Sequence, residues 1–184
     1  MLYRAFTDPS GGSSDSMTMA IAHDDPSTGR CVVDAVREVR PKFSPADVVE
    51  QFVQTLRNYR IPRITGDRYG AAWVAERFSE CGVVYDPADK PAAQLYLELL
   101  PALNSRLIEL PDDRRLISQL CSLERRTSRS GRDAVVHPVG AHDDLANAVA
   151  GVWAEKAPAG VFIADEMLES LRRWAPSRRY VRGS

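Results

Sequence analysis

Apolar residues near the start of the chain fall in short runs bounded by turn residues, as in β-strands. Three such runs occupy residues 2–7, 17–23 and 31–39. The second and third are separated by Asp24-Asp-Pro-Ser-Thr-Gly29, a turn sequence typical of an antiparallel hairpin. The pattern therefore predicts a three-stranded meander.

After residue 43 the apolar spacing changes to that of helices. Ser44 followed by Pro45 predicts a helix start with the serine at the N-cap. Apolar side chains then recur at helical spacing, at positions 48, 49, 52, 53 and 56. Further helices are predicted over residues 70–81, 92–105, 114–123 and 143–156. Short strands or extended segments are predicted over residues 61–65, 83–85, 107–110 and 134–139.

This order of elements predicts an α/β domain over residues 1–156, followed by a short helix and a basic tail over residues 157–184. A meander followed by strands that alternate with helices resembles the ribonuclease-H-like layout. In that layout a mixed β-sheet, with an antiparallel meander plus parallel strands, is flanked by helices.

The composition is that of a globular protein: 184 residues, 44% hydrophobic and 27% charged. Lys and Arg number 24 against 25 Asp and Glu, giving a net charge of −1. Near-neutrality argues against a nucleic-acid partner only if acids and bases are evenly mixed. Here the acids of interest stand at element ends, while arginines gather in residues 124–132 and in the C-terminal tail.

The three cysteines are widely spaced, which excludes a disulfide framework and a Cys-x-x-Cys metal site. Such cysteine usage is typical of a reducing compartment. No apolar run approaches the ~20 residues that a membrane span needs, and no signal-peptide pattern is found. We therefore expect a cytoplasmic protein with no membrane contact.

Acidic residues stand where predicted strands end and where the last predicted helix begins. Asp8 follows the first strand, Asp67 follows the fourth, and Asp143 and Asp144 come directly after His142. Carboxylates at the ends of neighbouring strands and at the start of a packed helix can converge, and carboxylates are ligands that Mg²⁺ prefers. Two such ions about 3.5–4 Å apart stabilise both the attacking and the leaving oxygen of a phosphodiester.

Each of these aspartates also has a structural interpretation. Asp8 before Pro-Ser-Gly-Gly is typical of a turn, and Asp67 beside Arg68 is typical of a loop ion pair. Asp143 fits a helix N-cap and Asp144 a first-turn acid, so one of the two is expected to be structural.

The face of the last helix favours Asp144 as the functional residue. Asn147 or Ala148, and then Gly151, follow it at helical spacing. Small residues at these positions would let the helix lie close to a sheet, with the Asp144 carboxylate at the edge of that sheet. His142 is a candidate metal-site partner, phosphate contact or general acid–base, and otherwise a local helix-entry residue.

Four motifs, in this order and spacing, resemble the C-terminal nuclease domain of tailed-phage terminase large subunits, and together they cover roughly residues 1–155. They are Asp8-Pro-Ser-Gly-Gly-Ser-Ser-Asp15, Gly66-Asp-Arg-Tyr-Gly70, Tyr85-Asp-Pro-Ala-Asp-Lys90 and Gly140-Ala-His-Asp-Asp-Leu-Ala-Asn-Ala148. The resemblance implies a ribonuclease-H-like nuclease that cleaves DNA during packaging with two divalent metal ions, Mg²⁺ or Mn²⁺. It implies metal ligands at Asp8, Asp67 and one of Asp143 and Asp144.

Two features depart from related families. The chain has no G-x-x-x-x-G-K-[ST] loop, so the packaging ATPase that accompanies the nuclease in a terminase large subunit is not encoded here. The sequence is thus expected to be either an excised domain or a stand-alone protein. The related Holliday-junction resolvases carry an acidic residue where this chain has Asn147, which weakens that interpretation.

Basic residues supply candidate DNA contacts. Arg125, Arg126, Arg129 and Arg132 lie in a glycine-containing stretch where the resemblance places a DNA-contacting hairpin, and guanidinium groups suit backbone phosphates. Lys90 is a further candidate. The alternative for the arginine stretch is a solvated loop without function.

The sequence therefore predicts a two-metal endodeoxyribonuclease with Asp8, Asp67 and Asp144 as ligands and with Asp143 and His142 in support. The expected partners are double-stranded DNA and, from the resemblance, a packaging ATPase domain, a portal and a small terminase subunit, in the host cytoplasm. Two alternatives stay open: a junction-resolvase-like nuclease of the same fold, and a catalytically weak module that docks on DNA or a portal.

Overall fold

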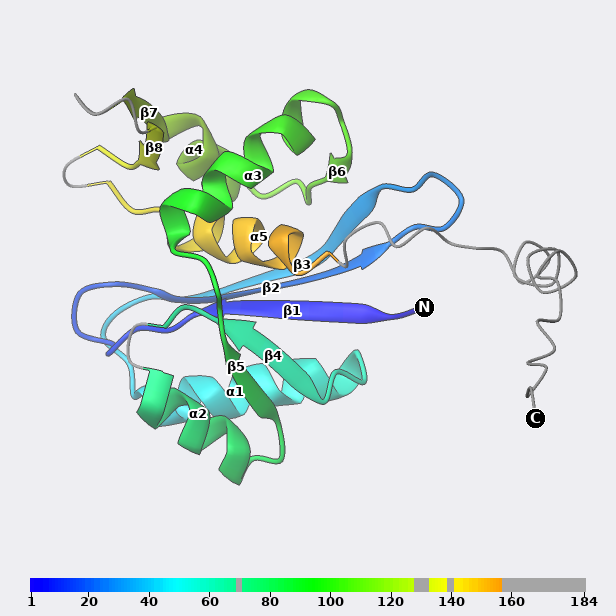
Figure 1. Ribbon diagram of the computed structural model, residues 1–184. Coiled ribbons are helices and arrows are strands. Elements are labelled where there is room, and N and C mark those ends of the chain that lie inside the picture. The colour runs from blue at the N-terminus through cyan, green and yellow to red at the C-terminus, as the bar shows by residue number, and fades with distance from the viewer. Residues whose placement is uncertain (69–70, 128–132, 139–140, 157–184) are drawn as a thin grey trace, which may run out of the picture.

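The computed structural model describes residues 1–68, 71–127, 133–138 and 141–156 (Figure 1). Six strands form one mixed sheet in the order β5-β4-β1-β2-β3-β6. The strands are β1 (Tyr3–Asp8), β2 (Met17–Asp24), β3 (Cys31–Val39), β4 (Arg63–Gly66), β5 (Val84–Pro87) and β6 (Ile108–Glu109).

The strand directions bring the carboxyl ends of three strands to one edge of the sheet. β1, β2 and β3 form the predicted antiparallel meander. β4 runs parallel to β1, and β5 runs parallel to β4. The carboxyl ends of β1, β4 and β5 therefore meet at the same edge. The predicted mixed sheet, with a meander plus parallel strands, is confirmed.

Helices cover both faces of the sheet (Figure 1). One face is covered by α1 and α2, the other by α3, α4 and α5, and each layer encloses its own cluster of buried apolar side chains. The helices are α1 (Pro45–Asn58), α2 (Ala71–Glu80), α3 (Ala92–Asn104), α4 (Arg114–Ser122) and α5 (Asp144–Ala154). Among the described residues, no helix is long and apolar enough to cross a bilayer.

Helix α5 lies directly on β1, and Gly151 makes this approach possible. A Cβ atom at Gly151 would overlap the ring of Phe6, which is fully buried in β1. The small residue expected on this helix face therefore has a packing function. Because α5 and β1 are in contact, the start of α5 is brought to the edge where β1 ends.

One strand was not predicted from the local sequence pattern, although the resemblance places a hairpin near this position. Residues 124–132 have the polar composition of a loop, yet β7 (Glu124–Thr127) pairs antiparallel with β8 (Asp133–Val136) in a separate two-stranded sheet. β7 carries polar side chains and gains its pairing from β8, so its own sequence lacks the apolar pattern of a strand. The short helix and basic tail expected within residues 157–184 lie outside the described residues.

Candidate active site

Asp8 and Asp67 stand beside each other at the carboxyl ends of two parallel strands. In the register of β1 and β4, Thr7 lies opposite Gly66. The next residues are Asp8 and Asp67, so both carboxylates leave the sheet at the same level. The Asp67 amide donates to the Thr7 carbonyl at 3.2 Å, which continues the pairing by one residue.

The backbone at Asp67 is held by the neighbouring strand β5. The Tyr85 hydroxyl donates to the Asp67 carbonyl at 2.7 Å, and the Ala88 amide donates to the Gly66 carbonyl at 2.8 Å. A Cβ atom on Gly66 would lie 2.5 Å from the Tyr85 hydroxyl and 2.8 Å from the Thr7 carbonyl oxygen. Only glycine fits this close approach.

Asp144, the first residue of α5, is held near the carboxyl ends of β1 and β4 through contacts with β2. Asp8 pairs with Thr18 across β1 and β2, and the Thr18 hydroxyl donates to the Asp144 carbonyl at 2.7 Å. The Ser16 amide donates to the Asp144 carboxylate. Asp144 is 8% exposed, and its Oδ2 atom is buried without a hydrogen-bond partner. A buried carboxylate oxygen without a partner is costly unless a cation or a proton meets it.

Asn147 lies on α5, almost one turn after Asp144. Its side-chain amide donates a hydrogen bond to the Asp8 carboxylate. It is 5% exposed, and its Oδ1 atom is buried without a hydrogen-bond partner. In the sequence, this position stands on the helix face that carries Asp144 and departs from the resolvases, but nothing there connects it to Asp8. The structure makes Asn147 the link between α5 and the carboxylate of β1.

Burial and mutual repulsion change the acidity of this group of carboxylates. Burial raises the pKa of Asp8 to about 8; the charges of Asp144, Asp67 and Asp143 add to the increase, and the Asn147 bond opposes it. Burial also raises the pKa of Asp144, and His142, whose Nδ1 is 3.9 Å from Asp144 Oδ2, works against that increase. The environment favours either a proton or a bound cation at these carboxylates.

Asp143 has different surroundings from Asp144. It occupies the N-cap position of α5, but its side chain makes no capping hydrogen bond. The Tyr96 hydroxyl of α3 instead donates to Asp143 Oδ2 at 2.8 Å, and His137 Nε2 lies 3.7 Å from Asp143 Oδ1. Burial, and then the Asp143 charge, raise the pKa of Tyr96, so this hydroxyl remains a donor.

The predicted basic contacts are distributed unevenly. Lys90 is paired with Glu98, with 2.7 Å between Nζ and Oε2. Arg126, on β7, is exposed and forms an ion pair with Glu124 at 2.9 Å. Arg129 and Arg132 lie outside the described residues.

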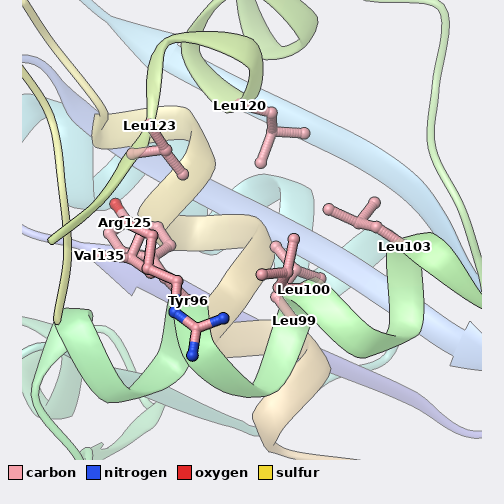
Figure 2. A pocket seen from close by; sticks show the side chains of 8 residues that line it. All are labelled: Tyr96, Leu99, Leu100, Leu103, Leu120, Leu123, Arg125 and Val135. Carbon is pink, nitrogen blue, oxygen red and sulfur yellow. The ribbon is translucent and has the colours of Figure 1, made fainter. Parts of the chain in front are cut away.

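Arg125 of β7 lies beside an apolar cavity of about 200 Å³ between α3, α4 and β8 (Figure 2). Leucines and Val135 make up most of its lining, and Tyr96 and Arg125 lie together at one end. None of the described residues that line this cavity carries a carboxylate, so it is distinct from the acidic edge. Tyr96 connects the two, because its hydroxyl reaches Asp143.

Two further residues near the site were not among the predicted site residues. Gln119 of α4 reaches the start of α5 with its side-chain oxygen. The charge of Asp15, in the loop after β1, raises the pKa of Asp144. Local sequence patterns could not have identified Gln119, because its partners lie 26 and 27 residues away in sequence.

The predicted site residues Asp8, Asp67, Asp144, Asp143 and His142 thus lie at one edge of the sheet. Among the residues that the structure describes, no three or more His, Cys, Asp or Glu side chains are grouped so as to hold a metal ion as they stand. The carboxylates come to the same edge of the sheet, but the described side chains do not have the geometry of a complete metal-binding site.

The mixed sheet and its helical layers have the ribonuclease-H-like fold. The chain is similar in structure to the large terminase nuclease of thermophilic phage G20c. The TM-score is 0.71 and the identity 17%, over 84% of this chain and 82% of that one. The large terminase nuclease domain of Thermus phage P74-26 gives 0.68 and 18%, over 83% and 78%.

The large terminase of bacteriophage HK97 gives a TM-score of 0.66 at 12% identity; the match spans 83% of this chain but 39% of that one. No family model and no curated protein matches the sequence itself. The resemblance predicted from four short motifs is therefore confirmed as a shared fold.

Proposed function

We propose that this chain is a metal-dependent endonuclease that hydrolyses phosphodiester bonds of double-stranded DNA. The observation that carries the proposal is that three aspartates from three separate elements are brought to the same edge of the sheet: Asp8 at the end of β1, Asp67 after β4 and Asp144 at the start of α5. Burial, and then the charges of Asp144 and Asp67, raise the pKa of Asp8.

The donor set fits a hard divalent cation. Carboxylate oxygens are the ligands that Mg²⁺ and Mn²⁺ prefer. The Asp144 Oδ2 atom is buried without a hydrogen-bond partner, and a cation would satisfy it. The G20c nuclease has been solved with bound magnesium and with cobalt, and the nuclease domain of virus Sf6 with manganese. We infer ligands at Asp8, Asp67 and Asp144, with two ions expected.

Bound there, two divalent cations would supply an activated water and stabilise the leaving 3′ oxygen of the phosphodiester. The chain's own residues orient the ligands. Asn147 holds the Asp8 carboxylate, and Thr18 holds the backbone of Asp144. His142 stands beside Asp144, where its Nδ1 atom can exchange a proton or contact a phosphate.

Asp144 is the better candidate than Asp143 for the direct ligand. The Asp143 carboxylate is occupied by the Tyr96 hydroxyl, whereas Asp144 keeps a buried oxygen without a partner beside Asp8. Asp143 then supports the site by adding negative charge to it.

Basic side chains would position the DNA by its phosphates. Arg126 is exposed on β7, and Arg125 lies next to it; Arg129, Arg132 and Lys90 complete the proposed set. By likeness to large terminases, we infer that the domain works beside a packaging ATPase, a portal and a small terminase subunit.

The test is nicking of supercoiled plasmid in Mg²⁺ or Mn²⁺. Asp8→Ala should abolish cleavage and leave the circular-dichroism spectrum unchanged, whereas Asp112→Ala, an exposed acid before α4, should cut like the wild type. Equal cutting by Asp8→Ala would refute the assignment.

Two further results would redirect the proposal. Preferred cutting of four-way junctions over linear duplex would favour a resolvase-like activity. A wild-type chain that binds DNA but neither cuts it nor binds Mn²⁺ would favour a docking module.

A further inference from the structure

The start of α5 is capped by a residue from another helix. An N-cap side chain ordinarily accepts hydrogen bonds from the second and third helical amides. In α5 these amides belong to Leu145 and Ala146, and both donate to the side-chain oxygen of Gln119, at 2.9 and 3.1 Å. Asp143, which holds the N-cap position, makes no such bond.

Gln119 is built into this position. It is 6% exposed and lies in α4, where it packs between the two helices. Its Nε2 atom is buried and has no hydrogen-bond partner among the described residues, so within that part of the chain the side chain hydrogen-bonds through its oxygen. A buried amide with half of its hydrogen bonds unmade is a costly way to stabilise a helix end, which indicates a benefit elsewhere.

That benefit is the freedom of the two carboxylates. Asp143 is able to cap α5 itself, since aspartate is among the best N-cap residues. If it did so, its carboxylate would turn toward the Leu145 and Ala146 amides and away from Tyr96, and the backbone next to Asp144 would turn with it. With Gln119 in place, Asp143 stays on Tyr96 and Asp144 stays beside Asp8.

We propose that Gln119 is a positioning residue, which caps α5 from α4 so that Asp143 stays on Tyr96 and Asp144 stays directed toward the metal site. This rests on the proposed function, in which Asp144 binds the cation. Residues that orient metal ligands typically change metal affinity 10–100-fold when they are replaced.

The experiment compares Gln119→Met, which keeps the volume and removes the oxygen, with Asp113→Ala, which removes the ordinary cap of α4. Mn²⁺ affinity is measured by calorimetry and stability by chemical denaturation. Both variants should lose stability. Gln119→Met alone should lose about tenfold in Mn²⁺ affinity, and Asp113→Ala should bind Mn²⁺ like the wild type. Equal Mn²⁺ affinity in Gln119→Met and the wild type would overturn the proposal.

A second measurement separates this inference from the proposed function. In metal-free protein, the NMR signals of the Leu145 and Ala146 amides should shift in Gln119→Met, while the Asp143 carboxyl signal should change as that group turns to the helix. An unchanged Asp143 signal would refute the positioning role. Failure of wild-type protein to bind Mn²⁺ would instead refute the proposed function.

Discussion

Helices α4 and α5 both begin after an aspartate, and the two aspartates do opposite things. Asp113 accepts hydrogen bonds from the Arg115 and Leu116 amides, both at 2.9 Å, as an N-cap should. Asp143 leaves the equivalent amides to Gln119 and directs its carboxylate to Tyr96. Asp113 therefore caps its helix, whereas Asp143 does not.

The difference between Asp113 and Asp143 shows how capping determines whether the charge of a carboxylate is compensated by the helix. A carboxylate that caps a helix is neutralised by amides and by the positive end of the helix dipole. At α5 that compensation goes to a neutral amide side chain, while Asp143 and Asp144 add negative charge around Asp8. An accumulation of negative charge at the end of a sheet favours the binding of a cation there.

The largest expected effect is a difference in cleavage activity between a variant of Asp144 and a variant of Asp113. Asp144→Asn should reduce metal-dependent cleavage about 100-fold or more, because a ligand charge is lost and such sites are sensitive even to their outer partners. Asp113→Asn should stay within about twofold, since asparagine caps as well as aspartate. Initial rates of plasmid nicking measure both, and similar losses in the two variants would contradict the comparison.

Next comes the pH dependence of the metal-free protein. The pKa of Asp8 is raised from 3.8 to about 8 in the folded chain. A raised acid contributes stability that is full below its unfolded pKa and is lost as pH rises through the folded value. In EDTA, stability should therefore fall between pH 4 and 8, and Asp8→Asn should flatten that decline. Denaturation midpoints across this range check the slope; no change in slope would contradict the assigned pKa.

The seat of α5 on the sheet should also distinguish it from α4. Gly151→Ala should destabilise by about 1–3 kcal/mol through overpacking against Phe6, although alanine is the better helix former. Ser118→Ala on the exposed side of α4 should change stability by less than about 0.5 kcal/mol. Urea denaturation gives both values, and a stabilised Gly151→Ala variant would show that α5 does not lie close to β1.

The smallest effect compares the two caps directly. Asp113→Ala should cost about 1 kcal/mol, because two helix amides lose their acceptor. Asp143→Asn should change stability by less than about 0.5 kcal/mol, since it keeps an acceptor for Tyr96 and caps nothing. Thermal melts of the two variants would reveal a capping role for Asp143 if their losses were equal.

Much of the fold could be predicted from local patterns. The third strand was predicted with its observed bounds, Cys31–Val39, and Ser44 caps α1 with Pro45 in its first turn. The helix predicted over residues 70–81 is α2, and Gly82, just after it, has a positive φ of 79°. These features depend on neighbours within a few residues, which is why the sequence showed them.

Other parts of the fold and site were beyond such patterns. β7 consists of polar residues and becomes a strand only by pairing with β8. The sequence left open whether Asp143 caps α5, since Asp143 stands at the start of a predicted helix and fits the N-cap position. That choice depends on Gln119, which arrives from α4.

The sequence by itself determined the order of strands and helices and the presence of acids at their ends, because periodicity and turn chemistry act between residues close in the chain. Only the tertiary structure decided which acid is released from capping and which side chain holds Asp8. Those outcomes depend on Gln119 and Asn147, whose partners lie far away in sequence and meet them only after the helices have packed on the sheet.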